Sequence, residues 1–95
     1  MNFLRGQGRF YLEDQTGKTI AEVDFPAYKE GVVDGVVEIT HTFVDDSLRG
    51  QGMAAKLMIA VVEMLEAEHK QAKLTCSYAV KWFAKHPEYA RFVAK

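Results

Sequence analysis

The residues with the clearest chemical potential lie where a predicted strand gives way to a predicted helix. The segment 36–44, rich in β-branched residues, is followed by Arg49-Gly50-Gln51-Gly52-Met53-Ala54 and then by apolar residues spaced at i, i+3, i+4 and i+7. Small residues at 50, 52 and 54 let a ligand approach the backbone, and unpaired N–H groups at a helix start attract anions. The segment predicts a pyrophosphate site. The alternative is a turn that needs glycine before a core helix.

Cys76 and His41 are the two side chains best suited to proton or group transfer. Cys76, the single cysteine, lies at the end of a predicted strand at 73–77, just before a predicted helix at 79–85. A helix N-terminus favours a thiolate, so Cys76 is a candidate nucleophile, a pocket-lining group or a small buried hydrophobe. His41 is a candidate general base; the alternative is a histidine that only hydrogen-bonds the backbone.

Two further side chains are weaker candidates for the same chemistry. Glu38 lies three residues before His41, so in one continuous strand it points to the opposite face and is an alternative base rather than a partner. Tyr78 is a candidate acid, or else a plain core or rim tyrosine. Trp82 and Phe83 are expected in the core. The three histidines are too far apart along the chain for metal-ligand spacing, so no metal is expected.

The elements that position these residues follow from hydrophobic patterning. Strands are predicted at 9–13 and 18–25 around an Asp14-Gln15-Thr16-Gly17 turn, with a third short strand at 27–33, an Asp34-Gly35 turn and a strand at 36–44. A helix to about residue 69, a strand at 73–77 parallel to 36–44, a helix at 79–85 and a helical piece at 88–94 complete the chain. The fold class is α+β: an antiparallel meander, then strand–helix–strand–helix, with a mixed sheet in a single domain over residues 1–95.

Composition bounds the class of protein. The 95 residues are 48% hydrophobic and carry a net charge of −1, which argues against nucleic acid as the main partner. A lone cysteine excludes an internal disulfide and fits a reducing, cytoplasmic compartment. No apolar run approaches the roughly 20 residues that span a bilayer, so no membrane is expected. An exposed strand edge is compatible with a monomer or a weak dimer.

The glycine segment resembles the acetyl-coenzyme A loop of the GNAT superfamily of N-acetyltransferases, whose pattern is Gln/Arg-x-x-Gly-x-Gly/Ala. Arg49, Gly52 and Ala54 occupy its three defined positions. The preceding strand, the following helix, His41-Thr42 and Cys76-Ser77-Tyr78 are similar to the minimal single-domain branch of that family, which lacks the early helices of larger members. The resemblance covers about residues 36–83, half of the chain.

The resemblance implies acetyl-CoA as co-substrate and an amine, not identified by the sequence, as acceptor. Backbone amides of the loop would bind the pyrophosphate, the edge of the strand at 36–44 would pair with the pantetheine amides, and a splay between this strand and the one at 73–77 would admit the thioester. The implied cofactor-binding residues are Phe43, Val44, Arg49, Gly50, Gln51, Gly52, Met53 and Ala54.

One departure from the family pattern affects the chemistry. Larger members carry Asn-x-x-Ala-x-x-x-Tyr after the later strand, and here the same register reads Cys76-x-x-Ala79-x-x-x-Phe83. Phe83 replaces the tyrosine that commonly protonates the leaving thiolate. The sequence therefore predicts an N-acetyltransferase whose general acid is unassigned, with a non-catalytic coenzyme A-binding or interaction module as the alternative.

Overall fold

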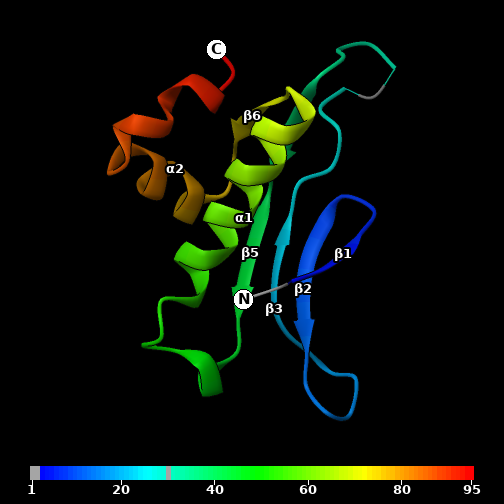
Figure 1. The fold of residues 1–95 in the computed structure, drawn as a ribbon, viewed down its shortest axis with the longest axis vertical. Helices are drawn as coiled ribbons and strands as arrows, with labels where there is room; N and C mark the ends of the chain where they lie inside the picture. Colours follow the sequence, from blue (N-terminus) through cyan, green and yellow to red (C-terminus); the bar gives the residue numbers. More distant parts are fainter. Residues whose placement is uncertain (1–2, 30) are drawn as a thin grey trace.

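The structure is a computed structural model that describes residues 3–29 and 31–95. As predicted, the strands of the first half come first, and a helix, a strand and further helical segments follow (Figure 1). The elements are β1 (Leu4–Gly6), β2 (Arg9–Glu13), β3 (Thr19–Asp24), β4 (Val36–Ile39), β5 (His41–Val44), the 3-10 helix η1 (Asp46–Leu48), α1 (Met53–Glu68), β6 (Gln71–Leu74), α2 (Ser77–Ala84) and the 3-10 helix η2 (Pro87–Phe92).

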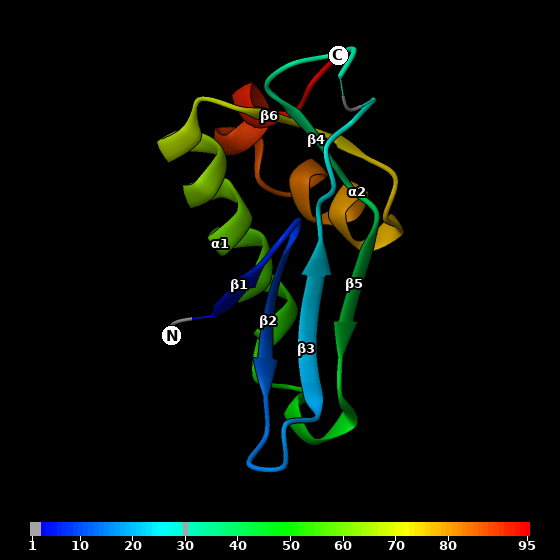
Figure 2. The ribbon, with the colours of Figure 1, turned by 90° about the vertical axis from the view of Figure 1, so that its right-hand side faces the viewer.

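The antiparallel meander is confirmed as a four-stranded sheet in the order β1-β2-β3-β5. The β2–β3 hairpin closes at the predicted turn, where Gly17 has a φ of 86° and the Asp14 carboxylate accepts a 2.8 Å hydrogen bond from the Thr16 amide. Along β3, Ala21 and Val23 are fully buried while Glu22 and Asp24 lie on the other face. The helices pack on the buried face only, and Figure 2 looks onto the open face of this sheet.

The predicted strand at 36–44 is two strands with a break at Thr40. β5 pairs antiparallel with β3, whereas β4 pairs in parallel with β6, with Ile39 opposite Leu74. The parallel pairing is confirmed, but β6 ends at Leu74 rather than at Ser77. The Ile39 carbonyl accepts hydrogen bonds from the amides of Thr75 (3.1 Å) and Cys76 (2.9 Å), and the chain then turns away into α2. β5 therefore continues with no strand beside it on that edge in the described part of the chain.

Two other sequence-based expectations about strands need correction. The segment 27–33 forms no strand apart from a single bridge between Ala27 and Val37, because Lys29 and Gly31 take positive φ values of 47° and 80°. Glu30 lies outside the described residues. Conversely, β1 was not predicted, since a three-residue strand is too short to show alternation.

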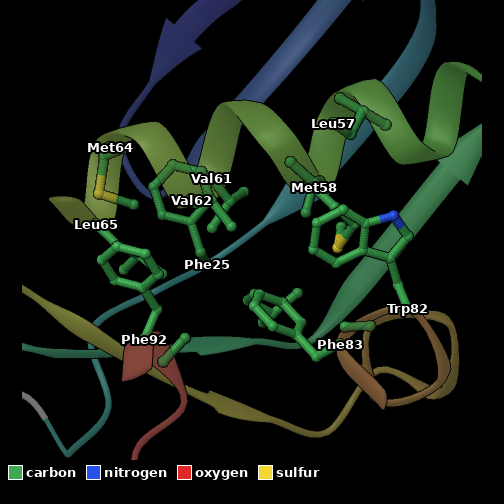
Figure 3. Close-up of a cluster of buried hydrophobic side chains, with 14 of the residues drawn as sticks. Phe25, Leu57, Met58, Val61, Val62, Met64, Leu65, Trp82, Phe83 and Phe92 are labelled. Carbon is green, nitrogen blue, oxygen red and sulfur yellow. The ribbon is translucent and has the colours of Figure 1, made fainter. Parts of the chain in front are cut away.

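The core lies between the sheet and the helices that cover one face. The predicted helix is confirmed as α1, and its apolar stripe contributes Leu57, Met58, Val61 and Leu65, all fully buried. Each such side chain contributes about 1.5–3 kcal/mol on burial. Trp82 and Phe83 of α2 pack edge to face at 5.0 Å between ring centroids, so their assignment to the core is also confirmed (Figure 3).

Candidate functional site

The glycine loop connects η1 to α1 in a conformation that requires glycine. Gly50 and Gly52 have φ values of 81° and 69°, and a Cβ built at either position meets no atom within 4 Å. The glycines are therefore needed for the left-handed backbone rather than for lack of space. The same open surroundings leave the backbone of the loop accessible.

The start of α1 presents backbone donors that no side chain caps. Gly52 is the N-cap, and it has no side chain that could accept a capping hydrogen bond. The first backbone hydrogen bond of the helix runs from the Lys56 amide to the Gly52 carbonyl at 3.1 Å. The amides of Met53, Ala54 and Ala55 precede that bond, so they have no acceptor within the helix. No acidic residue lies in the first turn. This helix end is electrostatically suited to an anion.

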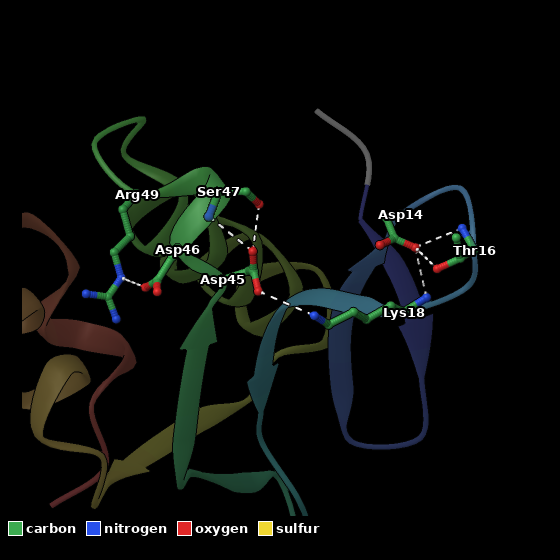
Figure 4. Close-up of polar contacts among 7 residues, drawn as sticks. All are labelled: Asp14, Thr16, Lys18, Asp45, Asp46, Ser47 and Arg49. Atoms are coloured by element: carbon green, nitrogen blue, oxygen red, sulfur yellow. Dashed lines mark hydrogen bonds and ion pairs between the residues drawn. The ribbon is translucent and has the colours of Figure 1, made fainter.

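Charged side chains around the loop are bound to one another (Figure 4). Asp45 caps η1 by accepting hydrogen bonds from the Ser47 hydroxyl (2.7 Å) and amide (3.1 Å), and the pKa of Asp45 is lowered by these bonds. Asp46 forms a 2.9 Å ion pair with Nε of Arg49. Both of those side chains are more than 70% exposed, so the ion pair is weak and costs little to break.

The remaining predicted donor-binding residues divide between the loop and β5. Gln51 is exposed, while Met53 is buried and anchors α1 to the core. Val44 packs against the core, and Phe43 projects from the open face of the sheet with 39% of its surface exposed. The free edge of β5 consists of main-chain groups, so any donor binding along this edge belongs to the backbone rather than to these side chains.

Cys76 faces β5 across the gap left where β6 ends. Its sulfur lies 3.4 Å from the hydroxyl oxygen of Thr42, a residue that the sequence analysis did not single out. Cys76 is also the N-cap of α2. Burial acts to raise the pKa of this thiol, but hydrogen bonds from Thr42 and from the amides of Ala79 and Tyr78 outweigh it, so the pKa is lowered.

The two aromatic residues considered as proton donors have different surroundings. Tyr78, in the first turn of α2, is half-buried, and burial raises the pKa of its hydroxyl, which keeps the phenol protonated. Phe83 is buried, with 5% of its surface exposed. The position at which larger family members carry tyrosine therefore contributes to packing here.

Glu38 and His41 lie on opposite sides of the break at Thr40. Glu38 accepts a 3.0 Å hydrogen bond from the Thr75 hydroxyl, next to Cys76. His41 is exposed on the open face of the sheet, where it is paired across strands with Asp24. Asp24 was not recognised as a candidate, although the alternation of β3 already assigned it to a polar face.

Comparison with known proteins identifies the family. The model of the GCN5-related N-acetyltransferases matches residues 9–92, which include the meander from β2 onward, the glycine loop, α1 and α2. The chain belongs to this family. The solved structure of a GCN5-like protein from Staphylococcus aureus superimposes with a TM-score of 0.76 at 29% identity, over 98% of this chain and 87% of that one. The expected fold is thus confirmed.

Two further comparisons cover a smaller part of this chain. The chain is 36% identical over 52 residues to the human protein NATD1, a match that includes 55% of this chain and 46% of NATD1. The chain thus spans about half the length of the curated relatives it matches. The N-acetyltransferase YhbS from Escherichia coli, solved in complex with CoA, has a TM-score of 0.58 at 24% identity over 70% of this chain and 38% of its own, which shows likeness of fold.

The described residues contain neither a helix that could span a membrane nor a group of side chains that could hold a metal ion. None of the helices within 3–29 and 31–95 is long and apolar enough to cross a membrane. Over the same residues, no group of three or more His, Cys, Asp or Glu side chains converges in a way that could hold a metal ion.

Proposed function

We propose that this protein transfers the acetyl group of acetyl-CoA to a primary amine. The observation that carries the proposal is the adjacency of two backbone features: the start of α1 behind Gly52, which no side chain caps, and the edge of β5 that no strand within residues 3–29 and 31–95 covers. Together they offer donors for a pyrophosphate and a strand edge for the pantetheine amides. Family membership and the CoA bound to YhbS support this assignment.

In the proposed reaction the amine attacks the thioester directly. The amine nitrogen forms a bond to the acetyl carbonyl carbon, the carbon–sulfur bond breaks, and the electron pair leaves on the CoA sulfur. The ammonium proton passes to a base before attack. Proximity and hydrogen bonding to the developing oxyanion supply most of the acceleration in such a site.

Cys76 lines the gap beside β5 in this scheme. Its lowered pKa and its contact with Thr42 support a role as a polar group beside the proposed thioester position. A covalent acetyl-cysteine intermediate is the competing mechanism. Mass spectrometry of the protein after brief incubation with acetyl-CoA distinguishes the two, because direct transfer leaves Cys76 unmodified and Cys76→Ala active.

Calorimetric titration with acetyl-CoA tests the donor site. Gly52→Glu adds a side chain and a negative charge at the start of α1, so we expect the loss of acetyl-CoA binding. Gly17→Glu is the matched control, since Gly17 also has a positive φ and open surroundings but lies in the β2–β3 turn. Equal binding by the two variants would contradict the proposed site.

A transfer assay separates the enzyme from its alternative. Acetyl-CoA carrying a labelled acetyl group is incubated with a panel of primary amines, and label on the amine is compared with the uncatalysed rate. A non-catalytic coenzyme A-binding module is the second candidate because Phe83 is buried at the position of the usual acid. That module would bind acetyl-CoA without any transfer.

A further inference from the structure

The open face of the sheet carries a group of polar side chains next to the gap at β5. β-Pairing sets two rows on this face: Arg9, Asp24 and His41 in one, and Tyr11, Glu22 and Phe43 in the other. Residues directly opposite each other in antiparallel strands project to the same side with Cβ atoms about 5 Å apart. Asp24 and His41 are therefore neighbours, although 17 positions separate them in the chain.

The charged and titratable groups around Asp24 are Arg9 and Tyr11 of β2, Glu22 of β3 and His41 of β5. Arg9 is already bound: its Nη2 forms a 2.9 Å ion pair with Glu22, and its guanidinium lies 3.8 Å from the centre of the Tyr11 ring. Within the described residues, no ion pair joins Asp24 to Arg9 or to His41. Asp24 is thus a carboxyl group without a cationic partner.

The position of His41 connects this face to the reaction. Its neighbour Thr42 points to the other side of the sheet, where it contacts Cys76 across the gap. A side chain at 41 and one at 42 therefore stand on opposite sides of the same strand edge. A thioester held in the gap would lie next to Thr42 and Cys76. An acceptor bound on the open face, next to His41, could reach that thioester across the edge of β5.

We propose that Asp24 and His41 form the acceptor site, with the Asp24 carboxylate binding the ammonium group and His41 taking its proton. This inference rests on the proposed function and names its acceptor class as cationic primary amines. The ammonium donates one hydrogen bond to Asp24 and gives a second proton to the neutral imidazole, which becomes imidazolium. The free amine then attacks the acetyl carbon.

The protonation of Asp24 supports this role. Burial, together with the hydrogen bond and the charge of Glu22, raises the pKa of Asp24 to about 6, and His41 opposes this rise. Above pH 6 the carboxylate is charged and can bind an ammonium group. The folded protein therefore keeps an ionised group that its surroundings disfavour, a cost in stability that is typical of functional sites.

Asp24→Asn is the test of ammonium binding. One hydrogen bond to a charged group contributes about 1.5–3 kcal/mol in proteins, so we expect the KM for the amine to rise at least about tenfold while the KM for acetyl-CoA is unchanged. In the wild type the amine KM rises as the pH falls through 6; in the variant it is high throughout. Glu13→Gln, an exposed acid at the end of β2, is the matched control.

Thermal unfolding distinguishes a functional Asp24 from a structural one. Because the ionised carboxylate is disfavoured in the folded state, Asp24→Asn should melt at or above the wild-type temperature at pH 7.5. The gain should be full above pH 6 and be lost as the pH falls from about 6 toward the ordinary value of 3.8. A purely structural Asp24 predicts a lower melting temperature. An amine KM within twofold of the wild type would overturn the inference.

A readout without turnover keeps the two proposals separable. The Asp24 carboxyl carbon is followed by NMR across the pH range in the wild type and in His41→Gln. Since the charge of His41 lowers the pKa of Asp24, its removal should move the titration midpoint to higher pH. No movement would refute the pairing even if transfer is observed. An absence of transfer with the movement intact would refute the enzyme, and with it the role of the pair in acceptor binding, while the Asp24–His41 pairing itself would stand.

Discussion

The contact between Thr42 and Cys76 makes a sharp prediction about thiol reactivity. Thr42→Val keeps the shape of the side chain and removes the hydroxyl that lies 3.4 Å from the sulfur. A hydrogen bond to a charged group contributes about 1.5–3 kcal/mol, and the sulfur contact is long and partly exposed, so the lower end applies. At a pH below the thiol midpoint, the thiolate fraction should fall about tenfold.

The measured rate should fall less than the thiolate fraction does. A thiolate of higher pKa is a better nucleophile, with a Brønsted slope of about 0.4–0.5, so the tenfold loss becomes a roughly threefold slower reaction with an aromatic disulfide reagent. The assay follows that reaction across the pH range. Cys76 is the sole cysteine, so no other thiol contributes.

Thr42→Ser is the control because it keeps the hydroxyl. It should react at close to the wild-type rate, whereas Thr42→Val should show both the slower reaction at neutral pH and a midpoint moved to higher pH. An unchanged midpoint in Thr42→Val would show that the backbone amides of Ala79, Tyr78 and Thr42, and not the Thr42 hydroxyl, lower the pKa of the thiol. The link across the gap would then have no electrostatic effect.

Two further predictions concern stability. Leu57→Ala removes a fully buried side chain and should lower the free energy of unfolding, measured by urea denaturation, by about 2–5 kcal/mol. Ile59→Ala, at a position 36% exposed on the same helix, should lower it much less. Equal losses would contradict the assigned core. Arg5→Gln breaks the 2.7 Å ion pair between Arg5 and Glu68, whose side chains are 49% and 31% exposed. The loss in free energy of unfolding should therefore stay below about 1 kcal/mol and shrink in high salt. A larger loss would show that the pair is better shielded from solvent than its exposure indicates.

The local sequence pattern was sufficient to predict the elements whose structure depends on residues close together in the chain. α1 was predicted to within one residue at each end, because its apolar residues repeat at the helical period. The Asp14–Gly17 turn was predicted because glycine readily takes the positive φ that the turn requires. The glycine loop resembled the family's donor site for the same reason. Its proposed function depends on main-chain amides, which a short motif specifies.

Long-range pairing accounts for the errors. The segment 36–44 has one continuous strand pattern, but Thr40 divides it because β6 pairs with the first half and β3 with the second. Nothing local in the sequence marks that break, since both halves are rich in β-branched residues. The lack of a strand at 27–33 depends likewise on positive φ at Lys29, which propensity does not predict.

The amino-acid sequence by itself predicts an anion-binding loop, because a helix start and its glycines are contiguous in the chain. The tertiary structure alone decides which side chains meet beside it. Thr42 reaches Cys76 across 34 positions, and Asp24 stands opposite His41 through the register of β3 and β5. Register shifts by one residue would move every side chain to the other face, so these partnerships depend on the packed sheet.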